Sequence, residues 1–106
     1  MNPILQQNIE KLIQSQKVFL FIKGTPENPA CGFSLRAVQI LHSLNIKFGS
    51  FDVFSDESMR QGVKEYANWP TFPQLYVEGK LIGGCDIIEE MASTGELQKL
   101  LANQKK

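Results

Sequence analysis

VFLFIKGTPENPACGFSLRAV, residues 18–38, decides how this chain folds. Its first five residues are all apolar and rich in β-branched and aromatic side chains, which is typical of a strand buried on both faces. A loop with two prolines and a glycine covers residues 23–30, and apolar residues then recur at helical spacing over residues 32–44. The stretch therefore predicts a central strand followed by a helix, with Cys31 directly before the helix.

The sequence on either side predicts an α/β domain in which helices cover both faces of a small sheet. A second strand over residues 47–53 follows closely enough to form a right-handed crossover, so the two strands are expected to be parallel neighbours. Periodicity leaves open whether the first strand of a later hairpin runs with or against the central strand. The remaining predicted elements are helices over residues 3–15, from Ser55 and Asp56 to Tyr66, from Asp86 to Met91 and from Thr94 onward, and hairpin strands at residues 75–77 and 81–83.

Local signals mark the ends of several of these elements. Asn2 followed by Pro3 fits an N-cap and a first helical position. Asp86 with Glu89 fits a capping box at the start of the fourth helix. A tight turn around Gly79 is expected to join the hairpin strands.

Composition excludes several classes of protein. The 106 residues suit one domain over residues 1–106, with 42% hydrophobic residues and 11 basic against 11 acidic side chains. Nucleic-acid binding is not expected, because it needs clustered Lys and Arg, and the one adjacent basic pair, Lys105–Lys106, is expected to be a solvated end. The longest apolar run is far too short for a membrane helix, and the first 15 residues lack a signal-peptide pattern. We therefore expect a cytoplasmic protein with no membrane partner.

Cys31 is the candidate reactive group. A thiol at a helix N-terminus faces unpaired backbone N–H groups and the positive end of the helix dipole, which lower its pKa and favour the thiolate. A thiolate is a nucleophile and a metal ligand; the alternative is a small buried side chain, the usual role of a free cysteine. Cys31 and Cys85 are expected to be free in a reducing compartment. We expect His42 on the polar surface of a helix. A zinc site is not expected, because the two cysteines and His42 are fewer than the four ligands it needs.

Ser34 stands where a redox protein with a CxxC motif carries its second cysteine. A mixed disulfide formed at Cys31 then has no resolving thiol within the motif, so another thiol must complete the exchange. The residues alone do not identify the source of that second sulfur.

Four motifs in order resemble those of the monothiol, CGFS-type glutaredoxins. They are KGTP at residues 23–26, CGFS at residues 31–34, WPTFP at residues 69–73 and GGCD at residues 83–86. The similarity extends from about Ile4 to Leu101 and is greatest to the short, single-domain bacterial members. It implies a thioredoxin fold with strand order 2-1-3-4, in which the hairpin's first strand is antiparallel to the central one.

This implied topology brings four chain segments to one edge of the sheet, where ligands of open α/β sheets bind. The family binds glutathione there. The resemblance implies that Lys23 and Arg60 pair with the glycine carboxylate, although either is alternatively an ordinary surface charge. Phe72 precedes a proline that is cis in the family, Pro73, and its backbone N–H and C=O are implied to bond the extended tripeptide.

The other end of glutathione is implied to bind at the GGCD motif. Gly84 allows the backbone to approach closely, and the N–H groups of Cys85 and Asp86 at a helix start hold the γ-glutamyl carboxylate. The Asp86 side chain is expected to bind the γ-glutamyl amine and also to cap its helix.

Our first functional hypothesis is an iron–sulfur carrier. A 2Fe-2S cluster normally takes four thiolates, and Cys31 offers one. Two protomers of a homodimer and two glutathiones together supply four, and the resemblance implies delivery of the cluster to iron–sulfur acceptor proteins and pairing with a BolA-like protein. The missing sulfurs then come from the partner chain and from glutathione.

Two other functions are compatible with the same residues. One is a glutathione-dependent thiol–disulfide oxidoreductase working through a mixed disulfide on Cys31, an activity that the resemblance implies is weak. The other is a module that only binds glutathione and a BolA-like partner. Cys85 either forms a regulatory disulfide with Cys31 or is a packed bystander thiol.

Overall fold

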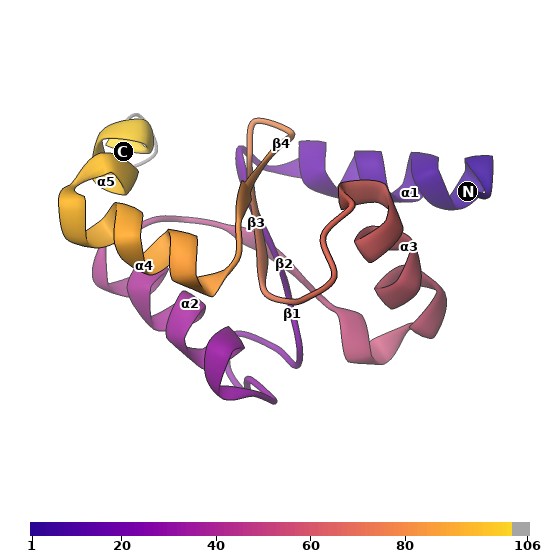
Figure 1. The fold of residues 1–106 in the computed structure, drawn as a ribbon, viewed down its shortest axis with the longest axis horizontal. Coiled ribbons are helices and arrows are strands. Elements are labelled where there is room, and N and C mark those ends of the chain that lie inside the picture. Colours follow the sequence, from indigo (N-terminus) through magenta and orange to yellow (C-terminus); the bar gives the residue numbers. More distant parts are fainter. Residues whose placement is uncertain (103–106) are drawn as a thin grey trace.

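The structure is a computed structural model that describes residues 1–102. The pair Lys105–Lys106 lies outside the described residues. Four strands form one sheet with helices on both faces (Figure 1). No helix in residues 1–102 has the length and apolar character needed to cross a membrane. In chain order the elements are α1 (Pro3–Ser15), β1 (Val18–Ile22), α2 (Gly32–Ser43), β2 (Gly49–Asp52), the 3-10 helix η1 (Val53–Ser55), α3 (Glu57–Ala67), β3 (Gln74–Val77), β4 (Lys80–Gly83), α4 (Cys85–Thr94) and α5 (Glu96–Leu100).

The strands are arranged in the order β2-β1-β3-β4. β1 runs parallel to β2, with Phe19 opposite Gly49, as the predicted crossover requires. β3 runs antiparallel to β1, with Leu75 opposite Leu20, and β4 runs antiparallel to β3. The direction that periodicity left open is thus the one that the resemblance implies. This is the thioredoxin fold, so the predicted fold class is confirmed.

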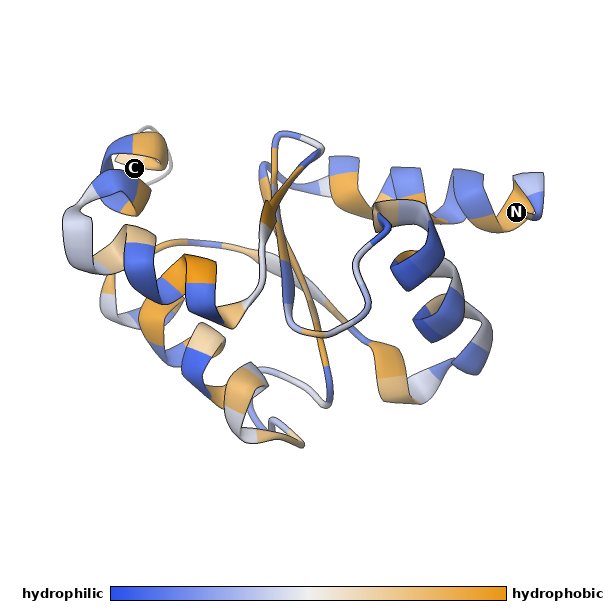
Figure 2. Ribbon diagram, viewed as in Figure 1, coloured by the Kyte–Doolittle hydropathy of each residue, from blue (hydrophilic) through white to orange (hydrophobic). Residues whose placement is uncertain are grey.

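β1 is buried on both faces because helices cover the sheet from two sides. α1 and α3 lie on one face, and α2, α4 and α5 lie on the other (Figure 1). Val18, Leu20 and Ile22 pack with α2, α4 and α5, whereas Phe19 and Phe21 pack with α1 and α3. In Figure 2 the strands are largely hydrophobic, and the helices on either side of the sheet carry hydrophilic residues, most clearly α3.

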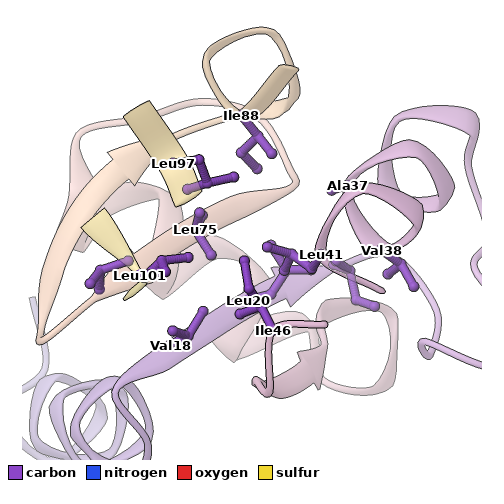
Figure 3. Close-up of a cluster of buried hydrophobic side chains, with 12 residues drawn as sticks. Val18, Leu20, Ala37, Val38, Leu41, Ile46, Leu75, Ile88, Leu97 and Leu101 are labelled. Carbon is purple, nitrogen blue, oxygen red and sulfur yellow. The ribbon is translucent and has the colours of Figure 1, made fainter. Parts of the chain in front are cut away.

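The cluster shown in Figure 3 fixes the two helices whose N-terminal ends reach the site. Leu41 of α2 and Ile88 of α4 are fully buried and belong to one cluster with Leu20 and Leu75 of the sheet. Burial of one such side chain stabilises the fold by about 1.5–3 kcal/mol. The core therefore fixes how α2 and α4 pack against the sheet.

Two local predictions are confirmed. The Asn2 side chain caps α1 by accepting a hydrogen bond from the N–H of Ile4 at 2.8 Å. The hairpin turn has positive φ angles at Glu78 and Gly79, as in the two-residue turns that match the twist of antiparallel strands.

The predicted capping box at the start of α4 is wrong. Gly84, in an extended conformation, is the N-cap residue, and Cys85 is the first helical residue. No side chain caps this helix, and Asp86 lies in its first turn. The helix begins earlier than predicted because its first backbone bond runs from the N–H of Ile88 to the carbonyl of Gly84.

The second strand is shorter than the predicted residues 47–53. It ends at Asp52, whose side chain accepts hydrogen bonds from the N–H of Phe54 at 2.8 Å and from the N–H of Gly24 at 2.9 Å. The first bond starts η1, and the second joins this turn to the loop that leads to Cys31.

Candidate functional site

The carboxyl ends of β1 and β4 and the segment before β3 meet at the lower edge of the sheet in Figure 1, together with the start of α2. A pocket of about 300 Å³ opens there. Six of the eight residues predicted for the site line it, namely Lys23, Phe72, Pro73, Gly84, Cys85 and Asp86. No role was predicted for the other four lining residues, which are Phe33, Trp69, Thr71 and Ile87.

Cys31 and Arg60 are not among the residues that line this pocket. Cys31 is the N-cap residue of α2, two positions before the lining residue Phe33. The Arg60 guanidinium donates hydrogen bonds to both carboxylate oxygens of Glu57 on its own helix, from Nε at 2.9 Å and from Nη2 at 3.0 Å. This pairing with Arg60 lowers the pKa of Glu57 to about 2. Arg60 is thus already paired within its own helix.

The thiol of Cys31 is held by Ser34, which is fully buried. The Ser34 hydroxyl accepts a hydrogen bond from the N–H of Lys23 at 3.0 Å and lies 3.4 Å from Cys31 Sγ. The Ser34 backbone N–H also donates to Cys31 Sγ at 3.4 Å. As a thiol, Cys31 donates to this hydroxyl; once ionised, the sulfur has no hydrogen and can only accept, so the Ser34 hydroxyl can donate to it.

The pKa of Cys31 lies below its ordinary value of 9.0. Partial burial of the thiol raises its pKa, but hydrogen bonds from Ser34 and Phe33 and the charge of Lys23 lower it and outweigh the burial. The predicted direction of the shift at this helix N-terminus is therefore confirmed. Cys31 is half-buried and hence not the fully buried thiol of the alternative interpretation.

Lys23 is positioned by the end of β1 and by an exposed phenylalanine. Its ammonium nitrogen lies 5.9 Å from the centre of the Phe54 ring, within the range of a cation–π contact. The N–H groups of Gly24 and Phe54 both donate to the Asp52 carboxylate. This shared acceptor holds the backbone next to Lys23 close to the backbone of Phe54.

The segment from Trp69 to Pro73 forms one wall of the pocket. The Phe72–Pro73 peptide bond is cis, as the resemblance implies. A Cβ added to Gly84 would lie 3.4 Å from the carbonyl oxygen of Pro73 and 3.4 Å from the Trp69 indole nitrogen. Gly84 thus allows this wall and the start of α4 to lie in close contact.

Comparison with known proteins agrees with this geometry. The sequence profile of the Glutaredoxin family matches residues 18–82. The chain belongs to the glutaredoxin family. With Ser34 as the last residue of its CGFS motif, it falls among the monothiol members, and it is 54% identical over 99 residues to the chloroplastic monothiol glutaredoxin-S14 of Arabidopsis thaliana.

These comparisons also define how much is shared. The match covers 93% of this chain and 57% of glutaredoxin-S14, and the chain spans 19–59% of the length of the curated relatives compared. The solution structure of reduced apo GrxS14 from poplar has a TM-score of 0.81 and 50% identity, covering 94% of this chain and 92% of that one. A buckwheat glutaredoxin–glutathione complex shares the fold, with a TM-score of 0.83 at 21% identity over 94% of this chain and 89% of that one.

The second thiol of this glutaredoxin differs from the first. Cys85 is buried, and its burial raises the pKa of the thiol, with further increases from Glu89 and Asp86. Both cysteines are free in the structure. At neutral pH Cys31 is therefore the better nucleophile and metal ligand of the two.

The glutaredoxin offers few metal ligands of its own. Among residues 1–102, no group of three or more His, Cys, Asp and Glu side chains is placed to hold a metal ion. His42 is exposed on α2, as predicted, with its ring 5.6 Å from that of Phe48.

Proposed function

We propose that this monothiol glutaredoxin binds glutathione in the pocket at the sheet edge and carries a 2Fe-2S cluster as a homodimer. Each protomer contributes Cys31, and two bound glutathiones contribute the remaining thiolates. The observation that carries this proposal is the single half-exposed thiol with a lowered pKa beside the pocket. The cluster is cargo that is passed to iron–sulfur acceptor proteins, and a BolA-like protein is the proposed partner in this task.

The donor set fits such a cluster only if external thiols take part. Iron–sulfur clusters are held by soft thiolate ligands, four for a 2Fe-2S centre. Cys31 supplies one, whereas the burial and raised pKa of Cys85 make it a poor ligand. Phe33 at the start of α2 is 65% exposed and offers apolar cover to a second protomer.

The pocket suits an extended tripeptide with a charged group at each end. Lys23 lines the pocket and is the cation for one carboxylate, and the backbone N–H groups of Cys85 and Asp86, at the start of α4, are the donors for the other. Phe72 also lines the pocket and has backbone groups to bond the peptide. The buckwheat complex holds glutathione on the same fold, which supports the assignment of this ligand.

Arg60 binds the glycine carboxylate only if its guanidinium leaves Glu57. Both partners are at least partly exposed, and exposed ion pairs of this kind are weak because water and salt screen them, so a ligand carboxylate can compete. The assignment of Arg60 stays a prediction, as do the cytoplasmic location and the short bacterial form.

The cluster proposal is tested by anaerobic reconstitution with iron, sulfide and glutathione, followed by absorption spectroscopy and size-exclusion chromatography. We expect a brown dimer with charge-transfer absorption that is lost without glutathione. Cys31→Ser is expected to abolish the colour, and the matched variant Cys85→Ser is expected to keep it. A colourless wild-type product, or full cluster retention by Cys31→Ser, refutes the proposal.

The second candidate function is reduction of glutathione mixed disulfides, which the lowered pKa of Cys31 favours. The Cys31 thiolate attacks the glutathione sulfur of the mixed disulfide, and the released substrate thiolate takes up a proton. A second glutathione thiolate then attacks the glutathione sulfur bound to Cys31, which frees glutathione disulfide and restores the Cys31 thiolate. Fast turnover of a glutathionylated peptide without cluster formation would favour this function, and binding without either would favour the binding module.

A further inference from the structure

We propose that Gln74 is a positioning residue for glutathione, which it holds in place indirectly by fixing the orientation of the Thr71–Phe72 peptide. This inference rests on the glutathione binding proposed above. Gln74 is the first residue of β3 and does not line the pocket.

Gln74 is an exception in a buried strand. Ser34 and Gln74 are the two buried side chains of strictly polar type in residues 1–102, and both lie next to the site rather than elsewhere in the core. Gln74 is 0% exposed within a strand whose other residues are apolar or aromatic. Burying an amide is unfavourable unless its hydrogen bonds are satisfied, so its position calls for partners.

The side-chain hydrogen bonds of Gln74 join it to the wall of the pocket and to Tyr76. Its Nε2 group donates to the carbonyl of Trp69 at 3.2 Å and to the carbonyl of Thr71 at 3.3 Å. Its Oε1 atom accepts from the hydroxyl of Tyr76 at 3.1 Å. Tyr76 thereby fixes which end of the amide faces the two carbonyls, and burial raises the pKa of Tyr76, so the hydroxyl stays a donor.

The bond to Thr71 determines where the N–H of Phe72 points. The Thr71 carbonyl and the Phe72 N–H belong to the same peptide unit, and in a trans peptide they point in opposite directions. The structure has its one cis bond in residues 1–102 at the next peptide, Phe72–Pro73. Because Gln74 holds the Thr71 carbonyl on the buried side, the Phe72 N–H is directed away from the core.

The Phe72 peptide groups are also free to bind a ligand. Within residues 1–102, neither the N–H nor the C=O of Phe72 makes a backbone or side-chain hydrogen bond. Phe72 itself is buried, and the segment around it lines the pocket. Gln74 thus holds a peptide unit ready for an extended ligand without touching that ligand.

The test is the affinity of the reduced apoprotein for reduced glutathione, measured by isothermal titration calorimetry, together with ¹H–¹⁵N NMR of the Phe72 amide. Gln74→Leu is expected to raise the Kd about 3- to 10-fold, the factor for one lost neutral hydrogen bond. The shift of the Phe72 amide on glutathione addition is expected to shrink, while the shifts of Cys85 and Asp86 persist. A purely structural role of Gln74 would change all three amides alike.

Two further variants keep the test decisive. Tyr76→Phe removes the hydroxyl that bonds Gln74 and is expected to raise the Kd for glutathione by a smaller factor than Gln74→Leu does. This variant provides the test if Gln74→Leu fails to fold. Ile46→Val, in the cluster on the opposite face of the sheet, is the control for lost packing and is expected to leave the Kd unchanged. The inference is overturned if the wild type binds glutathione and neither Gln74→Leu nor Tyr76→Phe alters the Kd or the Phe72 shift. If the wild type does not bind glutathione, the proposed function is refuted instead.

Discussion

Gly24→Ala tests whether the loop before Cys31 has a single permitted backbone shape. Gly24 has a φ of +91°, and a Cβ at this position would lie 2.6 Å from both the N of Ala30 and the O of Asn28. Both are backbone atoms, so no side chain can rotate out of the way. The loop that these atoms belong to closes through a bond from the N–H of Ala30 to the carbonyl of Lys23 at 2.8 Å and through reciprocal bonds between Thr25 and Asn28.

The expected loss of unfolding free energy has two parts. A non-glycine residue in the left-handed region costs about 1–2 kcal/mol. Relief of the clash must break some of the loop's three backbone hydrogen bonds, each of which contributes about 1 kcal/mol. We therefore expect Gly24→Ala to lower the unfolding free energy by about 2–4 kcal/mol, which still leaves a typical small domain folded.

Two other glycines separate these parts. Gly95 has a φ of +85° but open space around its Cβ position, so Gly95→Ala measures the conformational cost alone, about 1–2 kcal/mol. Gly32 has neither a positive φ nor a neighbour within 4 Å, so Gly32→Ala is expected to change stability little. The assay is urea unfolding followed by fluorescence of Trp69, the single tryptophan. Equal losses for Gly24→Ala and Gly95→Ala would show that the backbone clash carries no weight and refute the reasoning.

Three further predictions concern the site. Ser34→Ala removes the hydroxyl that lowers the pKa of Cys31, so the pH midpoint of Cys31 alkylation by iodoacetamide is expected to rise and the rate at pH 7 to fall about 3- to 10-fold; an unchanged midpoint contradicts this. Phe54→Leu removes the ring beneath an ammonium group and is expected to raise the Kd for glutathione about 2- to 5-fold in calorimetry, with stability unchanged because the ring is exposed. Glu57→Gln releases Arg60 and is expected to lower that Kd by up to about 5-fold, whereas weaker binding would exclude Arg60 as a ligand.

Most of the fold is determined by patterns that act over short distances along the chain. Val18–Ile22 is apolar at every position, and its burial on both faces follows directly from that run. The helical spacing in α1 and α2 likewise reports which side meets the sheet. The direction of β3 is different, because Gln74–Val77 is buried throughout and reads the same in either orientation. Its antiparallel pairing with β1 came from the resemblance and is confirmed by the register.

The site was predicted less completely because its contacts join residues far apart in sequence. Asp52 reaches Gly24 across 28 positions, and no periodic pattern signals that a strand will end to make this bond. Arg60 was assigned to a ligand, but a carboxylate three residues away on the same helix already occupies its guanidinium. Glu57 and Arg60 are three residues apart in a predicted helix, a spacing at which opposite charges pair, so the sequence already indicated this ion pair. Gln74 carried a signal as well, as a polar residue in an otherwise apolar strand.

Ser34 shows how one substitution has two chemical consequences. Read as a missing thiol, it explains why Cys31 cannot form a disulfide within its own motif. In the structure the same side chain bonds the backbone at Lys23 and has its hydrogen free for the sulfur, which favours the thiolate. A cysteine at this position would offer a weaker hydrogen-bond donor and a competing ligand. The serine thus favours the thiolate of Cys31 and leaves it without an internal disulfide partner, and the proposed cluster with glutathione and a second protomer requires both conditions.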